Sequence, residues 1–174
     1  DRRERGAINA FERRFKHIGE GYAKLVEQIP AQPVVNRRYN FDLDQAVLMS
    51  ILAQGDLFID SVLLEGGEYA LWFYVDYVGQ AYTSGLVSEW RNLAHQSEAY
   101  AALNPTPQQL LRSEAVRSRM ALVQARQFEL MKGVAGRTKA DLARVLTEGI
   151  ANGKNPKDIA KAIHQETALG AKRS

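Results

Sequence analysis

The side chains that most often carry chemistry are few and scattered in this chain. The three histidines, His17, His95 and His164, lie far apart, and none has a histidine partner at the i, i+4 spacing of helical metal ligands. Asp42 and Asp44 stand near an expected helix start, where carboxylates favour the helix dipole and capping explains them better than acid–base catalysis. We therefore expect no catalytic residues, no metal site and no cofactor.

Sequence motifs for covalent or phosphate chemistry are also missing. The chain has no cysteine, so disulfides, thiol nucleophiles and thiolate metal sites are excluded. Gly66-Gly67 is not followed by the Lys-Ser/Thr of a phosphate-binding loop, and no G-x-S-x-G elbow is present. We expect a protein that is not an enzyme. The remaining alternative, after the two functions described below, is a fragment of an enzyme whose active site lies on other sequence.

A basic stretch near the end, "GKNPKDIAKAI" (Gly153–Ile163), is the strongest candidate for binding. Gly153 suits the left-handed position after a helix, Asn155 an N-cap and Pro156 the first helical position, which predicts two helices joined by a tight turn. Outward lysines on the second helix suit phosphate contact, whereas base reading usually uses Arg, Asn or Gln. The candidate nucleic-acid-binding residues are Lys154, Lys157, Lys161, Lys172 and Arg173. An ordinary helix hairpin inside a scaffold is the competing interpretation.

Charge is distributed unevenly along the 174 residues, whose net charge is +3. Residues 41–98 contain nine acids and one base, whereas residues 132–174 contain nine bases and four acids. Basic ends and an acidic middle favour anion binding at the ends or packing against charged neighbours. No uncharged run of about 20 residues occurs, because acids such as Asp56 and Asp60 interrupt the most apolar region, so we expect no membrane span.

Apolar residues recur at steps of three and four, which predicts an all-α protein. We expect about five to six helices in an elongated helical bundle with a C-terminal helix hairpin. The expected segments are residues 1–40 (an N-terminal helix or arm with a connector), 41–136 (a central helical core) and 137–174 (the hairpin and a basic tail). The expected helices cover residues 3–28, 43–64, 68–97, 107–134, 139–152 and a last helix from Pro156, with 34–40 as a connector.

Several local features sharpen these boundaries. Gly19 and Gly21 indicate a bend, whereas Gly79 and Gly85 indicate a closely packed neighbour. Helix starts are expected at Asn40 or Asp42, at Thr106 with Pro107, and at Thr138 after a break at "GVAGRT". The aromatic cluster of Trp72, Phe73, Tyr74 and Tyr77 is typical of a core or an interface.

The stretch "RQFELMKGVAGRTKADLARVLTEGIANGKNPKDIAKAIHQET" resembles the tailed-phage minor head protein, or head morphogenesis, family (Mu-like F proteins and relatives). The resemblance covers roughly residues 70–167 and includes the small-residue helix "YVGQAYTSGL" (Tyr77–Leu86). The family usually continues into an Arg-rich helix, whereas this chain ends at "GAKRS". The matching positions are Thr138, Leu142, Leu146, Gly149, Gly153, Pro156, Asp158, Ile159, Ala160 and Ile163.

This resemblance implies a structural virion protein inside the phage head, attached to the portal vertex and acting in head morphogenesis and DNA packaging or ejection. It implies the portal protein as a partner, several copies around the portal, and contact with packaged DNA and the major capsid protein. Before packaging, such a protein would lie in the host cytoplasm. The alternative is a helical DNA-binding protein that uses the Lys154–Lys161 hairpin.

Overall fold

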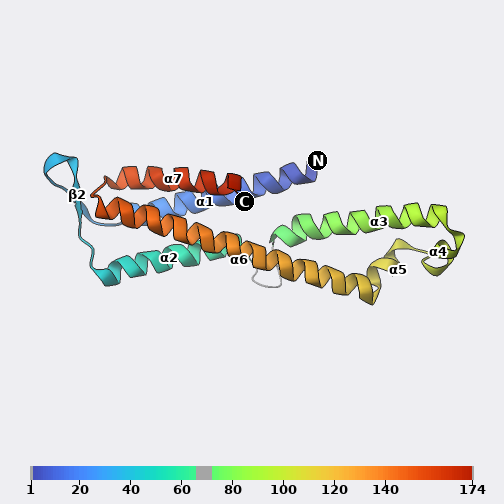
Figure 1. Ribbon diagram of the computed structural model, residues 1–174. Coiled ribbons are helices and arrows are strands. Elements are labelled where there is room, and N and C mark those ends of the chain that lie inside the picture. Colours follow the sequence, from blue (N-terminus) through green and yellow to red (C-terminus); the bar gives the residue numbers. More distant parts are fainter. Residues whose placement is uncertain (1, 66–71, 174) are drawn as a thin grey trace. The chain divides into compact units, whose positions relative to one another are not determined.

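The computed structural model describes residues 2–65 and 72–173, and it confirms the all-α prediction. The described part contains seven α-helices and one two-stranded hairpin (Figure 1). Five to six helices were expected. The additional helices are two short ones: residues 98–103 lie where a loop was expected, and residues 107–112 form the start of an expected longer helix. The chain forms two compact units: the first consists of residues up to Glu65 and from Met131 onward, and the second of the residues between. These units differ from the three expected segments: the beginning and the end of the chain share one unit, and the expected boundary between residues 136 and 137 lies inside α6 (Glu114–Ala151).

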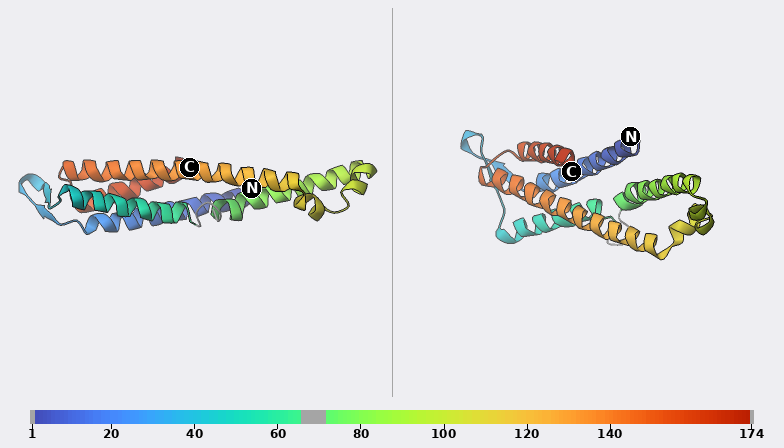
Figure 2. Two further views of the ribbon diagram at one scale, coloured as in Figure 1. Left: turned by 90° about the horizontal axis from the view of Figure 1, so that it is seen from below. Right: turned by 45° about the vertical axis from the view of Figure 1, so that its right-hand side comes forward.

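The first helix, α1 (Arg2–Glu27), belongs to the core of the first unit and is not a separate arm. It buries Phe15, Ile18, Tyr22 and Val26 on one stripe against α7 (Pro156–Arg173), which lies beside it in both views of Figure 2. Helix α1 is continuous through Gly19 and Gly21. Gly19 instead permits close packing, because a Cβ there would lie 2.6 Å from Thr167 Oγ1.

The connector expected at residues 34–40 is a β-hairpin. Strands β1 (Ala31–Pro33) and β2 (Tyr39–Phe41) pair antiparallel, and a 3₁₀ turn, η1 (Val35–Arg37), joins them. Strands of three residues are too short to show the alternation from which a strand is read in sequence.

Helix α2 (Gln45–Leu63) begins after Asp44, whose Oδ1 accepts a hydrogen bond from the backbone N–H of Val47 (2.8 Å). The cap is therefore neither Asn40 nor Asp42. Among the described residues, α2 alone is long and apolar enough, by length and composition only, to cross a membrane. Within the first unit it buries Ile59 and Leu63, and its Asp60 pairs with Lys139 of α6 (2.7 Å). The rest of its apolar window is mostly exposed, with 22% of it buried.

Helix α6 is continuous through "GVAGRT", so the break and the N-cap predicted at Thr138 are wrong. The Thr138 hydroxyl donates to the Val134 carbonyl one turn earlier (2.9 Å) and is buried. Packing of neighbouring residues such as Leu142 and Leu146 against the core outweighs the local cost of two helical glycines, about 1 kcal/mol each. The predicted turn into α7 is confirmed: Gly153 has φ +61°, and Asn155 Oδ1 accepts from the Lys157 N–H (2.9 Å).

The second unit contains a π-helical turn, η2 (Tyr74–Val78), followed by α3 (Gly79–Gln96), α4 (Glu98–Leu103) and α5 (Pro107–Arg112). Of the helix expected at 68–97, residues up to 71 lie outside the described residues, as does Gly66-Gly67. The helix start at Thr106 and Pro107 is confirmed, but this helix ends at Arg112 and α6 starts anew, so the single helix expected at 107–134 is wrong.

Two further expectations concern packing in this second unit. The atoms nearest to a Cβ at Gly79 all belong to Tyr74 in the preceding helical turn, the closest being its carbonyl oxygen at 3.1 Å, and Gly85 faces open space, so neither glycine shows the expected close approach of a separate segment. The aromatic cluster is confirmed by ring contacts of Trp72 with Phe73 and Tyr77, whose centroids lie 5.4 and 6.3 Å away.

The continuity of α6 predicts opposite effects for two glycine substitutions. Gly136→Ala, in open space, should raise the free energy of unfolding by about 0.4–1 kcal/mol through lower backbone entropy of the unfolded chain. Gly149→Ala should lower it by about 1–3 kcal/mol, because the new Cβ would lie 2.7 Å from Ile159 Cγ1. Urea unfolding followed by circular dichroism measures both. A destabilising Gly136→Ala would indicate that the helix is broken at this glycine after all.

Tyr22 predicts a loss of stability at alkaline pH. Burial raises the pKa of Tyr22 to about 12, with a further contribution from the Asp56 carboxylate. Because the unfolded chain releases the phenol proton near pH 10 and the folded chain retains it, stability contributed by the neutral phenol falls as pH rises from about 10 to 12. Tyr22→Phe should reduce this loss in urea unfolding at pH 8, 10 and 11. Parallel stability curves for the two proteins would contradict the assignment.

Candidate nucleic-acid interface

The structure divides the five predicted binding residues between two places. Lys154, in the turn, and Lys157 and Lys161, one helical turn apart on α7, lie near the start of that helix and are exposed. Lys172 and Arg173 lie near its other end. At 1.5 Å per residue, Lys157 and Lys172 are separated by roughly 22 Å along the helix axis. The five residues therefore do not form one compact cluster.

Arg173 takes part in an ion-pair network at the far end of α7. Its guanidinium lies 2.6 Å from Glu166 Oε1, and Arg144 of α6 approaches the same carboxylate at 3.7 Å. Part of its charge is thus balanced within the protein. The Arg144–Glu166 contact joins α6 to α7, whereas the Arg173–Glu166 pair lies within α7.

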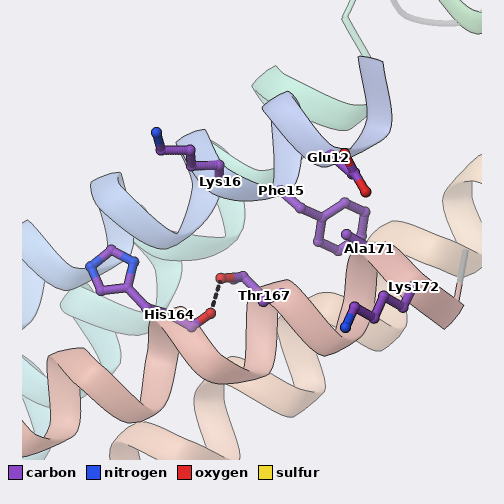
Figure 3. A pocket seen from close by; sticks show the side chains of 8 residues that line it. Glu12, Phe15, Lys16, His164, Thr167, Ala171 and Lys172 are labelled. Atoms are coloured by element: carbon purple, nitrogen blue, oxygen red, sulfur yellow. Dashed lines mark hydrogen bonds between the residues drawn. The ribbon is translucent and has the colours of Figure 1, made fainter. Parts of the chain in front are cut away.

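Lys172 lies on the rim of a groove of about 300 Å³ between α1 and α7 (Figure 3). Phe15 and Ala171 contribute apolar surface to it. Charges of both signs line the groove, from Glu12 on one hand and Lys16 and Lys172 on the other, and the exposed His164 adds an imidazole. A groove with mixed charge does not extend the cationic surface of the other lysines toward Lys172. Within residues 2–65 and 72–173, no three His, Asp or Glu side chains gather as metal ligands would.

The β-hairpin adds two cations that sequence analysis missed. The Tyr39 N–H donates to the Gly153 carbonyl (2.9 Å), and Asn155 Nδ2 donates to Tyr39 Oη (3.2 Å), so the hairpin is fastened to the α6–α7 turn. Arg38 Cβ lies 3.4 Å from the place that a Cβ on Gly153 would occupy. Arg38 and its neighbour Arg37 are thereby held at the same end of the first unit as the turn lysines.

We call this surface the basic end; it consists of Arg37, Arg38, Lys154 and Lys157. All four side chains are exposed. In the part of the chain that the structure describes, none of them lies within 4.0 Å of a carboxylate, unlike Arg14, Lys139 and Arg173. Cations without internal partners are available to an external polyanion, and each phosphate they neutralise releases bound counterions. The arrangement therefore suits phosphate contact.

Comparisons of the chain with models of protein families, with curated proteins and with solved structures found no match.

A strained backbone position within the basic end gives a prediction. Asn36 and Arg37 have φ of 65° and 61°, and arginine in this left-handed region costs roughly 1 kcal/mol relative to glycine. Arg37→Gly should therefore raise the free energy of unfolding by up to about 1 kcal/mol, measured in urea, while removing one cation. Arg38→Gly, which starts from an extended φ of −87°, is the matched control and should be neutral or destabilising. Equal effects of the two changes would argue against the turn geometry.

Proposed function

We propose that this chain is a structural protein of the tailed-phage virion, a minor head protein attached to the portal vertex inside the capsid. In this role it acts in head morphogenesis and in DNA packaging or ejection. Several copies surround the portal, with the portal protein as principal partner and the major capsid protein and packaged DNA as further neighbours. The protein lies in the virion head after assembly and in the host cytoplasm during it.

The observation that carries this proposal is the role of the residues that resemble the minor head family. Leu142 and Leu146 of α6 and Ile159 and Ile163 of α7 are all buried in one core. Gly149 gives Ile159 room against α6. The shared pattern thus encodes a packed helix hairpin, as expected of a family whose members build contact surfaces.

The outer face of α2 supports docking to a large partner. Met49 and Leu57 are 59% and 71% exposed, and Ala53 between them is exposed as well. The helical repeat places all three on one face, which lies away from the buried Gly55 and Ile59 and also carries Asp60, eleven positions after Met49. Exposed apolar residues that share a face are typical of interaction sites. We therefore assign portal contact to this face, named the α2 face (Met49, Ala53 and Leu57).

The acidic middle of the chain contributes less to partner contact than its composition suggested. Asp44 caps α2, Asp60 pairs with Lys139, and Glu65 pairs with Arg14 at 2.7 Å. These carboxylates stabilise the first unit internally. The proposal accordingly relies on the apolar α2 face and not on an acidic surface.

Co-purification with the portal protein tests the proposal. The full chain, co-expressed with the portal protein of the same phage, should be retained on tagged portal. Met49→Glu/Leu57→Glu should weaken this retention at least tenfold, since charges at the centre of an apolar contact each cost about 1–2 kcal/mol or more. Leu103→Glu on α4, where the leucine is 83% exposed, is the matched control and should have little effect. A folded wild-type protein that ignores the portal would refute the proposal.

The basic end favours a second candidate function, a helical DNA-binding protein. Its support is the meeting of Arg37 and Arg38 with Lys154 and Lys157 through the Tyr39–Gly153 hydrogen bond. A direct DNA binder should lose affinity steeply as salt rises. Changing Lys154, Lys157 and Lys161 to Glu should abolish duplex binding under this candidate and leave portal retention intact under the first.

A further inference from the structure

The tip of the β1–β2 hairpin exposes apolar side chains that the chain itself does not cover. Val35 is 84% exposed and Val34 is 49% exposed. The two residues that follow, Asn36 and Arg37, both occupy the left-handed region, which folds the chain back within the turn. The Val34 N–H donates to the Arg38 carbonyl (2.7 Å) and closes the loop. The tip is therefore a closed turn that exposes two valines, an asparagine and two arginines.

These residue types are the ones that contact base edges in a major groove. Arginine pairs with guanine O6 and N7, asparagine with adenine N6 and N7, and apolar side chains contact the thymine methyl group. Helix α7 offers mainly lysines outward, which suit phosphates and carry no sequence information. The tip supplies the base-reading groups that α7 lacks.

The hairpin is a kind of element that a DNA duplex accommodates. A two-stranded ribbon can enter the major groove, which is about 12 Å wide. The hydrogen bonds from Tyr39 to Gly153 and from Asn155 to Tyr39 hold the ribbon against the start of α7, so Lys154 and Lys157 are fixed behind it. Two carboxylates are close in sequence to the basic end: Asp42, after β2, and Asp158, on α7. Among the described residues, neither lies within 4.0 Å of a cation of the basic end, so these cations are not neutralised by them.

We propose that the hairpin tip, Val34–Arg38, is the base-contacting element of a duplex-DNA interface, with Lys154 and Lys157 on the flanking phosphates. This inference rests on the second candidate function and assigns it a reading element. The protein is then a sequence-selective DNA binder. The β1–β2 hairpin enters the major groove, and helix α7 does not.

Selection of duplexes from a library with a randomised 16-base-pair centre, using the purified full chain, tests the proposal. Wild-type protein should enrich a preferred sequence and bind it at least tenfold more tightly than a scrambled duplex, by fluorescence anisotropy. Arg37→Lys/Arg38→Lys should remove most of this preference while leaving the salt dependence unchanged, because lysine keeps the charge but not the forked geometry. Val34→Ser/Val35→Ser should reduce preference at positions with thymine.

The proposed phosphate contacts predict a different result, a loss of affinity that does not depend on DNA sequence. Lys154→Gln/Lys157→Gln should weaken preferred and scrambled duplexes equally and lower the slope of log affinity against log salt by about 2. Arg119→Gln/Arg126→Gln on α6 removes the same charge from exposed positions in the second unit and is the matched control. It should leave the preference unchanged.

The outcomes separate the inference from the functions on which it depends. Duplex binding without any enriched sequence, or with a preference that survives the tip variants in folded protein, would overturn the inference and leave the second candidate function standing. Absence of duplex binding at low salt would refute both the inference and the second candidate function. Binding to anionic lipid vesicles in place of DNA would refute both as well. The portal experiment tests the first candidate independently of either result.

Discussion

The junction between Gly153 and Tyr39 is the contact on which the arrangement of the first unit depends. Gly153 has φ +61°, and a Cβ there would lie 3.0 Å from the Tyr39 carbonyl oxygen, so both conformation and space restrict this position to glycine. Its own carbonyl accepts the Tyr39 N–H at 2.9 Å. One residue thus ends α6, directs the chain into α7 and holds the hairpin. A larger residue at this position would disturb all three.

The position of helix α7 also depends on close contacts between α7 and α1. A Cβ on Gly170 would lie 2.8 Å from the Phe15 ring, and one on Gly19 would lie 2.6 Å from Thr167 Oγ1. The two glycines let α1 and α7 approach closely enough to bury Ile159 and Ile163. Full burial of such side chains contributes about 1.5–3 kcal/mol each. The packing of α1 and the geometry of the turn therefore support the same position of α7.

Features encoded by neighbouring residues could be predicted from the sequence. The stripe of Phe15, Ile18 and Tyr22 gave α1, and the Gly153, Asn155 and Pro156 pattern gave the turn and the start of α7. Each of these signals depends on sequence positions a few residues apart.

Features decided by distant contacts could not be predicted in the same way. The hairpin is held by a hydrogen bond between Tyr39 and Gly153, 114 positions apart, so nothing local showed that Arg37 and Arg38 return to the turn lysines. Gly133 and Gly136 looked like a break, yet the buried neighbours Ala135 and Leu142 keep α6 helical. Half of the candidate site could therefore be predicted from the sequence. The turn motif predicted its lysines, whereas its arginines could be assigned only from the fold.

The two proposed functions use different surfaces of the first unit. The α2 face is apolar and suits a protein partner, whereas the basic end is cationic and suits a nucleic acid. The junction of Gly153 and Tyr39 matters most for the basic end, because without it the arginines and lysines would not share a surface.

Residue-resolved hydrogen exchange of the Tyr39 amide tests this junction most directly. We expect strong protection of that amide, comparable with the amides of the Ile159–Ile163 turn of α7, because its N–H is bonded to Gly153 and is released only when the turn opens. In Gly153→Ala, protection of Tyr39 should fall further than protection of Val34, whose bond to Arg38 lies within the hairpin. A Tyr39 amide that exchanges as fast as an exposed one, while α7 stays protected, would show that the junction does not hold the hairpin.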